Sequence, residues 1–281
     1  MAGAAAARKK NISDLVLADQ RIQLGRGEED LFEEMRERLL VMKDSAAKGA
    51  GEHVRSPSGL SGGLSFLMQK RLRTETLSGP FCTAALARAL AVSEYNASMG
   101  KIVAAPTAGA CGILSAAVLS MVEEKGVCEK PAVMSLFTAG ALGMVIANEA
   151  CIAGAEGGCQ AECGSAAAMA AAALTELAGG SPSMAVHAAA MALKNQLGLV
   201  CDPVAALVEV PCVKRNAGGL MCAIGAAEMA LAGIESVIPL DEVISAMDEI
   251  GKALPPSLRE TAQGGLAATP TALGLRRRIF G

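Results

Sequence analysis

The segment CGSAAAMAAAALTEL, residues 163–177, decides the fold class of this chain. Alanine is the best helix former among the amino acids, so the run predicts an α-helix. A second run, MAVHAAAMALKNQLG at residues 184–198, has the same character. Because alanine side chains are small, helices of this composition can approach closely, and we expect a tightly packed helical core.

The composition of the whole chain supports the same fold class. Of its 281 residues 52% are apolar, yet aromatic residues make up 2%, with no Trp, one Tyr and five Phe. A β-sandwich needs aromatic and β-branched residues in alternation, and no such alternation is present. The chain is therefore predicted to be all-α, an Ala/Gly-rich helical domain with its core between about residues 80 and 250.

Three regions follow one another along the chain. Residues 1–10 are expected to be a flexible tail. Residues 11–79 are predicted to contain two amphipathic helices within 12–48, then a Gly/Ser-rich loop. Residues 80–281 are predicted to be the helical core, in one domain with 11–79, and to end in a turn-rich, basic terminus.

Charge and cysteine content exclude several classes of protein. The net charge of −3, without a basic stripe or stacking aromatics, argues against a nucleic-acid partner. Nine cysteines without an export signal predict reduced thiols and a cytoplasmic location. Two charge-free stretches, 102–122 and 131–148, are long enough to span a bilayer. Their Pro, Gly, Ser and Ala content predicts buried helices of a soluble protein instead, with no membrane partner.

Two cysteines flank the segment CDPVAALVEVPC, residues 201–212. Asp202-Pro203 is typical of a helix start, and Pro211 breaks a helix. A continuous helix would hold the two Cα atoms roughly 16 Å apart, too far for one compact metal cluster. With the break at Pro211, the second cysteine can fold back, so that both flank a short helix. The segment therefore allows shared ligation without requiring it.

A third cysteine, Cys159, follows two glycines that permit close approach of a bulky group. Its separations from Cys201 and Cys212 are irregular, and the short paired spacing typical of zinc sites is absent. Spacing alone leaves two interpretations open, which are cluster ligands or buried core thiols.

Three segments in order resemble the signature segments of bacterial iron–sulfur L-serine dehydratases, more narrowly the α subunit of the two-subunit type. They are KIVAAPTAGACGIL (101–114), GAEGGCQAECGSAAAMAAAAL (154–174) and CDPVAALVEVPCVKRNA (201–217). The resemblance covers the chain from the first amphipathic helices to about residue 250. It implies a [4Fe–4S] cluster held by Cys159, Cys201 and Cys212, a separate β subunit, and an oligomer. Cys163, which stands where the family has an apolar residue, could compete with Cys159.

The resemblance also implies a reaction, the β-elimination of water from L-serine, which yields pyruvate and ammonia. A cluster with three protein ligands leaves one iron free to act as a Lewis acid on the serine hydroxyl. The turn at residues 105–112 resembles a substrate loop, in which Thr107, Ala108 and Gly109 offer donors for a carboxylate. The alternative is a helix-start turn capped by Thr107.

Each of the other candidate residues can be interpreted in two ways. Lys214, Arg215 and Asn216 could clamp the substrate carboxylate or donate to cluster sulfur, or form a charged helix end in solvent. Lys101 could be a catalytic base or an exposed lysine. The acidic residues Glu149, Glu156 and Glu162 could move protons, or be helix-end charges.

Two alternative functions remain at this stage. One is a related cluster-dependent lyase acting on another β-substituted amino acid such as cysteine. The other is an iron–sulfur-binding protein without turnover.

Overall fold

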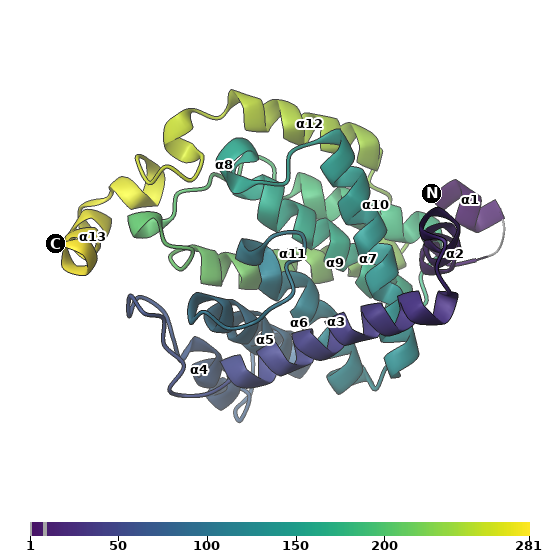
Figure 1. Ribbon diagram of the computed structural model, residues 1–281, viewed down its shortest axis with the longest axis horizontal. Helices are drawn as coiled ribbons and strands as arrows, with labels where there is room; N and C mark the ends of the chain where they lie inside the picture. Colours follow the sequence, from purple (N-terminus) through teal and green to yellow (C-terminus); the bar gives the residue numbers. More distant parts are fainter. Residues whose placement is uncertain (1, 8–9) are drawn as a thin grey trace.

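The computed structural model of the chain describes residues 2–7 and 10–281 and confirms the all-α prediction. No β-strand forms in these residues, apart from one isolated parallel bridge between Cys201 and Arg259. Figure 1 shows the helices gathered in one bundle, with the two ends of the chain at opposite sides. The α-helices are α1 (Ala2–Ala7), α2 (Ile12–Leu24), α3 (Glu28–Gly49), α4 (Leu64–Arg71), α5 (Gly79–Ala97), α6 (Cys111–Lys125), α7 (Glu129–Glu149), α8 (Gly154–Gly157), α9 (Ser165–Leu177), α10 (Pro182–Lys194), α11 (Cys212–Leu231), α12 (Leu240–Ala253) and α13 (Pro270–Phe280).

Short helical turns connect several of these helices. One of them, Gln160–Gly164, is a turn of π-helix that leads directly into α9. The others are 3₁₀ turns, η1 (Ala108–Ala110), η3 (Val204–Ala206), η4 (Pro256–Leu258) and η5 (Gly265–Ala268).

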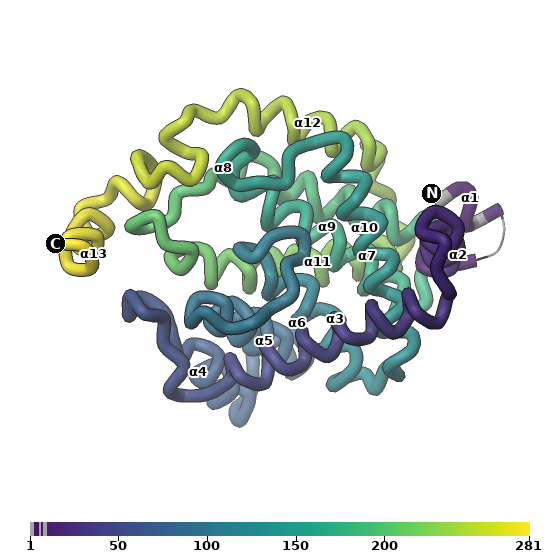
Figure 2. The backbone as a smooth tube through the Cα atoms, viewed as in Figure 1, coloured from purple at the N-terminus to yellow at the C-terminus, as the bar shows by residue number. Residues whose placement is uncertain are grey.

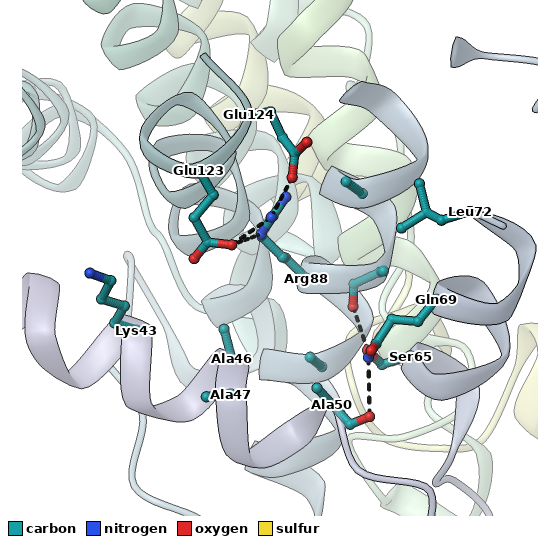
Figure 3. A pocket seen from close by; sticks show the side chains of 13 residues that line it. Lys43, Ala46, Ala47, Ala50, Ser65, Gln69, Leu72, Arg88, Glu123 and Glu124 are labelled. Atoms are coloured by element: carbon teal, nitrogen blue, oxygen red, sulfur yellow. Dashed lines mark hydrogen bonds and ion pairs between the residues drawn. The ribbon is translucent and has the colours of Figure 1, made fainter. Parts of the chain in front are cut away.

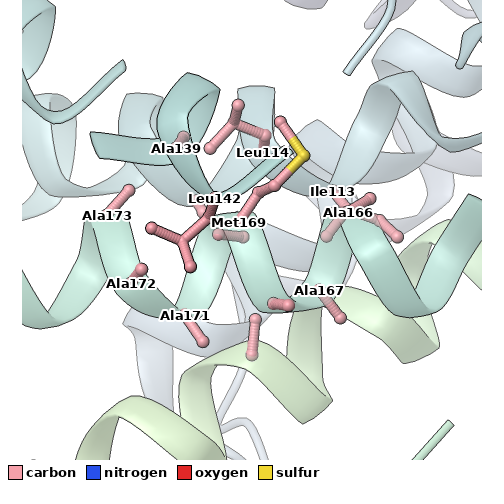
Figure 4. Close-up of a cluster of buried hydrophobic side chains, with 14 of the residues drawn as sticks. Ile113, Leu114, Ala139, Leu142, Ala166, Ala167, Met169, Ala171, Ala172 and Ala173 are labelled. Carbon is pink, nitrogen blue, oxygen red and sulfur yellow. The ribbon is translucent and has the colours of Figure 1, made fainter. Parts of the chain in front are cut away.

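Helix α9 is the centre of the core, as its alanine run predicts. Its residues from Ser165 to Thr175 are all buried. It packs against α6, α7, α10 and α11, and Figure 4 shows its alanines and Met169 facing Ile113, Leu114 and Leu142. A helix that is apolar on every side is stable only where other helices surround it. The small side chains permit this by letting the neighbouring backbones come close.

Close helix contact also occurs at the end of α3. A Cβ atom added to Gly49 would lie 1.9 Å from the carbonyl oxygen of Ala91 in α5. The predicted apolar stripe of this helix is buried at Leu31, Leu39 and Met42. The helix therefore packs on α5 through a glycine contact and on the bundle through that stripe.

The Gly/Ser-rich region contains a helix that the sequence did not predict. Helix α4 begins at Leu64 because the buried carboxylate of Glu94 accepts the first backbone N–H groups of the helix. Leu64 N donates to Oε1 at 2.9 Å, and Ser65 N donates to Oε2 at 3.0 Å. A carboxylate at this position satisfies two otherwise unpaired donors and suits the helix dipole.

The two charge-free stretches have different structures. Residues 102–107 are irregular, η1 follows, and α6 begins at Cys111, so the first stretch is not one continuous helix. The second forms α7, the one helix of the described chain long and apolar enough by composition to cross a membrane. Within its apolar window 61% of the residues are buried in the bundle, which a core helix also shows.

Both ends of the chain contain helices that the sequence did not predict. The predicted tail falls partly on residues 1, 8 and 9, which lie outside the described residues, but Ala2–Ala7 form α1, and Ala5 is buried. After α12 the chain passes the 201–211 loop before it ends in α13, as the trace in Figure 2 shows. The three arginines at 276–278 are exposed, as predicted.

Candidate functional site

The three candidate cysteines come from three separate parts of the bundle and lie near enough for their charges to affect one another's pKa. Cys159 immediately precedes the π-helical turn, Cys201 opens the loop before η3, and Cys212 is the first residue of α11. Cys159 and Cys201 are buried, and Cys212 is half-buried. Burial, together with the smaller effect of the nearby Cys159, raises the pKa of Cys212 to about 12. Burial is also the main cause that raises the pKa of Cys201, with Cys159 and Cys212 contributing. The folded chain thus gathers the three thiols where they repel one another's negative charge.

The loop between Cys201 and Cys212 corrects one prediction. The Asp202-Pro203 helix start produces only the single 3₁₀ turn η3, in which Ala205 has a φ of 58°. The Asp202 side chain does not cap this turn, because its carboxylate is engaged elsewhere. The predicted break at Pro211 is confirmed, since α11 begins at the next residue. Cys212 therefore lies at the positive end of a long helix, and the helix dipole acts against the rise in its pKa that burial causes.

Arg215 links this loop to the cysteines. Its guanidinium donates to Asp202 Oδ1 and to the carbonyl of Val200, both at 2.8 Å. Its positive charge lowers the pKa of both Cys159 and Cys212, in opposition to burial. Of the basic residues beside Cys212, Arg215 thus points into the protein, whereas Lys214 is exposed to solvent.

A segment from the C-terminal end covers Cys201. The backbone N–H of Cys201 donates to the carbonyl of Leu258, and Glu260 N donates to the carbonyl of Cys201 at 2.7 Å. Asp202 Oδ2 accepts from Leu266 N at 2.7 Å. The backbone of residue 265 lies so close to the Asp202 side chain that an added Cβ atom would clash with it, so only glycine fits there. No motif marked this contact in the sequence, because it depends on backbone groups more than 50 residues away.

The predicted substrate turn lies beside the cysteines and is held by Asn216. The Asn216 amide donates to the Gly109 carbonyl at 2.7 Å, and its Oδ1 accepts from Gly112 N at 2.8 Å. The side chain is buried, so in this structure Asn216 shapes the turn. Its predicted contact with substrate stays a prediction.

Thr107 occupies the cap position of η1, but its side chain makes no capping bond. Its Oγ1 is buried and has no hydrogen-bond partner among the described residues, a property shared with Ser165 Oγ. An unpartnered buried hydroxyl is unusual and is a donor available to a ligand. Ala108 next to it is exposed and Gly109 is half-buried, so the turn is accessible from solvent.

Glu162 reaches the same turn from the π-helix. A Cβ added to Gly109 would lie 3.2 Å from Glu162 Oε2, and one added to Gly154 would lie 3.0 Å from that atom. The Cβ atom added to Gly154 would also lie 3.1 Å from Cys201 Sγ. The Glu162 carboxyl group therefore lies close to both the turn and Cys201. Burial raises the pKa of Glu162, and the neighbouring Thr107 hydroxyl partly offsets that effect without completing a hydrogen bond.

The remaining residues that the sequence suggested for the site are exposed to solvent. Lys101 and Lys214 are exposed and form no ion pair among the described residues. The proposed roles of both as bases stay predictions. Glu149 and Glu156 are also exposed.

The Gly/Ser-rich loop is tied to the cysteine loop through Glu209, a contact that the sequence analysis missed. The buried Glu209 carboxylate accepts from Ser58 Oγ at 2.7 Å and from Ser61 Oγ at 2.6 Å. The Gly/Ser-rich loop is therefore held next to the segment between Cys201 and Cys212.

The candidate donors are cysteine thiols, the ligand type that iron–sulfur clusters take. Within residues 2–7 and 10–281, no three His, Cys, Asp or Glu side chains lie close enough to hold one ion. A cluster is larger than an ion and takes cysteine thiolates. The glycines beside the thiols leave room, since a side chain at Gly154 would meet Cys201 Sγ, and Arg215 supplies positive charge.

One surface pocket lies away from this site. Figure 3 shows this pocket, of about 470 Å³, between α3, α4, α5 and α6. Arg88 spans it and pairs with Glu123 and Glu124 at 2.5 and 2.6 Å, so its charge is already balanced. None of the cysteines, and no residue of the Thr107 turn, lines this pocket.

Comparisons with known proteins find relatives over most of the chain. The family described as serine dehydratase alpha chain matches residues 7–267. A probable L-serine dehydratase alpha chain of Bacillus subtilis is 51% identical over 96% of this chain and 90% of its own length. The L-serine dehydratase alpha chain of Peptoniphilus asaccharolyticus is 50% identical over 72% of this chain and 70% of its own. An L-serine dehydratase of Escherichia coli is 48% identical over 64% of this chain, which corresponds to 40% of that longer protein.

Proposed function

The chain belongs to the serine dehydratase alpha chain family, and we propose that it is the α subunit of an iron–sulfur-dependent L-serine dehydratase. Its reaction is the conversion of L-serine to pyruvate and ammonia. One observation carries the proposal. Three cysteines separated by 42 and 11 residues in sequence meet beside a turn that holds an unpartnered buried hydroxyl.

The cluster proposed here is [4Fe–4S], with Cys159, Cys201 and Cys212 as its protein ligands. When bound, such a cluster supplies a Lewis acid that assists departure of the serine hydroxyl. The chain's own residues bind and orient the substrate. Thr107 Oγ1 and the free backbone N–H groups at the start of η1 are donors for the substrate carboxylate. Asn216 keeps that turn in place, and the segment from 258 to 266 shields Cys201 from water.

Elimination of water leaves aminoacrylate, which tautomerises and hydrolyses to pyruvate and ammonia. Removal of the Cα proton requires a base, for which Lys101 and Lys214 remain the candidates proposed from sequence. We also propose a separate β subunit, since the relatives of similar length are called alpha chains, together with an oligomeric assembly and a cytoplasmic location. Neither nucleic acid nor membrane enters this proposal.

The test uses the chain produced together with its β subunit and purified without oxygen. We expect a brown protein with about four irons per α chain that forms pyruvate from L-serine. Cys159→Ala, Cys201→Ala and Cys212→Ala should each lose the iron and the activity. Cys222→Ala is the matched control, because Cys222 is another half-buried thiol on α11, and it should keep both.

Each other outcome has a definite meaning. Faster turnover of L-cysteine than of L-serine would favour the related lyase. A full cluster without turnover of any β-substituted amino acid would favour a binding protein. A colourless chain that resists reconstitution with iron and sulfide would refute the cluster.

A further inference from the structure

The proposed substrate carries a second charge that the turn does not address. L-Serine at neutral pH is a zwitterion, and its carboxylate is matched by the donors around Thr107. Its α-ammonium group needs acceptors, because a charged donor removed from water without a partner is strongly disfavoured. The following inference rests on the proposed function and concerns the residue that accepts this group.

The three carboxylates that are buried among the described residues, those of Glu94, Asp202 and Glu209, are already engaged. Asp202 accepts from Arg215 and from Leu266 N. Glu209 accepts from the hydroxyls of two serines. Glu94 accepts the first two N–H groups of α4. None of these three has oxygen atoms free for a ligand ammonium group without breaking an existing contact.

Glu162 differs from them. No lysine or arginine in the described part of the chain pairs with it. The Thr107 hydroxyl and the Gly154 N–H lie near enough to lower its pKa, but Thr107 Oγ1 forms no hydrogen bond of normal geometry. Glu162 is half-buried, so a small molecule can reach it. Its carboxyl group lies against Gly109 of the substrate turn and near Cys201, as measured from the Cβ positions of Gly109 and Gly154.

The charges around Glu162 also favour a cation. Glu260, from the segment that covers Cys201, is close enough to raise the pKa of Glu162, in addition to the larger effect of burial. The two carboxyl groups thus lie near enough for their charges to repel, and neither forms an ion pair with a lysine or arginine of the described residues. A bound ammonium group relieves that repulsion, whereas a second anion would increase it.

We propose that Glu162 binds the α-ammonium group of the amino-acid substrate, with Glu260 adding negative potential, while the Thr107 turn binds the carboxylate. The two groups are held on adjacent walls of the site. This arrangement selects an α-amino acid over a hydroxy acid of the same shape. Glu162 is therefore a specificity-determining residue.

The test compares the Glu162→Gln variant with the wild-type holoenzyme. L-Serine is the substrate, and 3-hydroxypropionate is the inhibitor, because it keeps the carboxylate and hydroxyl of serine but has no ammonium group. A charge-assisted hydrogen bond contributes enough that its loss should raise KM for L-serine about 10- to 100-fold, with kcat within a few-fold. Inhibition by 3-hydroxypropionate should be unchanged by the substitution. Iron content and the visible spectrum should also be unchanged. Glu156→Gln, which removes an exposed charge from the preceding turn, should match the wild type in every measurement.

The possible results separate cleanly. An unchanged KM for L-serine overturns the inference, and so does an equal rise in KM and in the 3-hydroxypropionate inhibition constant. A lower kcat with unchanged KM also overturns it and assigns Glu162 to the chemical step. If Glu162→Gln loses iron, Glu162→Asp is the second variant, because its shorter side chain keeps the charge but holds it farther from the substrate. It should raise KM for L-serine while leaving 3-hydroxypropionate inhibition unchanged. A wild-type enzyme that does not turn over L-serine refutes the proposed function itself, independently of any variant.

Discussion

The Sγ atoms of Cys159 and Cys163 lie 3.4 Å apart at the start of α9, and both side chains are buried. The Cys163 thiol is the main cause that lowers the pKa of Cys159, and the same contact raises the pKa of Cys163. Of the two thiols, Cys159 therefore loses its proton more readily than Cys163. This asymmetry favours Cys159 as the ligand and Cys163 as its neutral neighbour.

The first prediction follows from that asymmetry. Cys163→Ala should keep about four irons per chain, as in the wild type, whereas Cys159→Ala should lose them. The small void left by the sulfur should lower the free energy of unfolding by about 1 kcal/mol. Iron analysis and the visible spectrum of the two variants decide the matter. Equal loss of iron in both would show that Cys163 takes part in binding the cluster.

The second prediction concerns the carboxylate that fastens the C-terminal segment. Asp202→Ala leaves the partly buried Arg215 and the Leu266 N–H without their partner, so the free energy of unfolding should fall by about 3 kcal/mol. Tryptic cleavage after Arg259 should become faster. Asp248→Ala removes a carboxylate paired with the exposed Lys252 and should change stability by less than about 1 kcal/mol. Similar effects of the two substitutions would contradict this role of Asp202.

The third prediction tests the close packing of helices. Gly49→Ala places a methyl group against the backbone of Ala91, which neither helix can avoid without moving, and should destabilise the fold by about 2 kcal/mol or more. Gly140→Ala in the interior of α7 meets no atom within 4 Å and should stabilise it by about 0.5–1 kcal/mol. Urea denaturation measures both. A neutral Gly49→Ala would mean that α3 and α5 are not held at this separation.

The fourth prediction is a pH dependence. The pKa of Glu162 is raised, chiefly by burial, so the folded chain binds its proton more tightly than the unfolded chain does. Ionised Glu162 consequently opposes folding above its unfolded pKa, and this opposition grows as the pH rises through its folded pKa. Glu162→Gln should then be more stable than the wild type at pH 7 when both are free of the cluster. The difference should vanish in acid, below the ordinary pKa of a glutamate. A variant less stable at pH 7 would show that the charged carboxylate is stabilised by the fold.

Much of the fold could be predicted because it depends on local sequence. The alanine runs that form α9 and α10 have a helix preference of their own, and the apolar stripe of α3 indicates which of its faces is buried. Helix α4 was missed because its start depends on Glu94, 30 residues away, and its own residues lack a strong amphipathic pattern. The helix expected after Asp202 failed for the same kind of reason, since distant partners occupy the side chain that would have capped it.

The sequence by itself determined the fold class, the family and which cysteines are candidates for ligands, because composition and motif order are properties of the chain read in one dimension. Only the tertiary structure decided that Asn216 holds the substrate turn, that residues 258–266 cover Cys201, and that Glu162 remains without a cation among engaged carboxylates. These facts depend on hydrogen bonds and charges between groups far apart in sequence. Such contacts leave no periodic signal, because their partners become neighbours only when the helices pack.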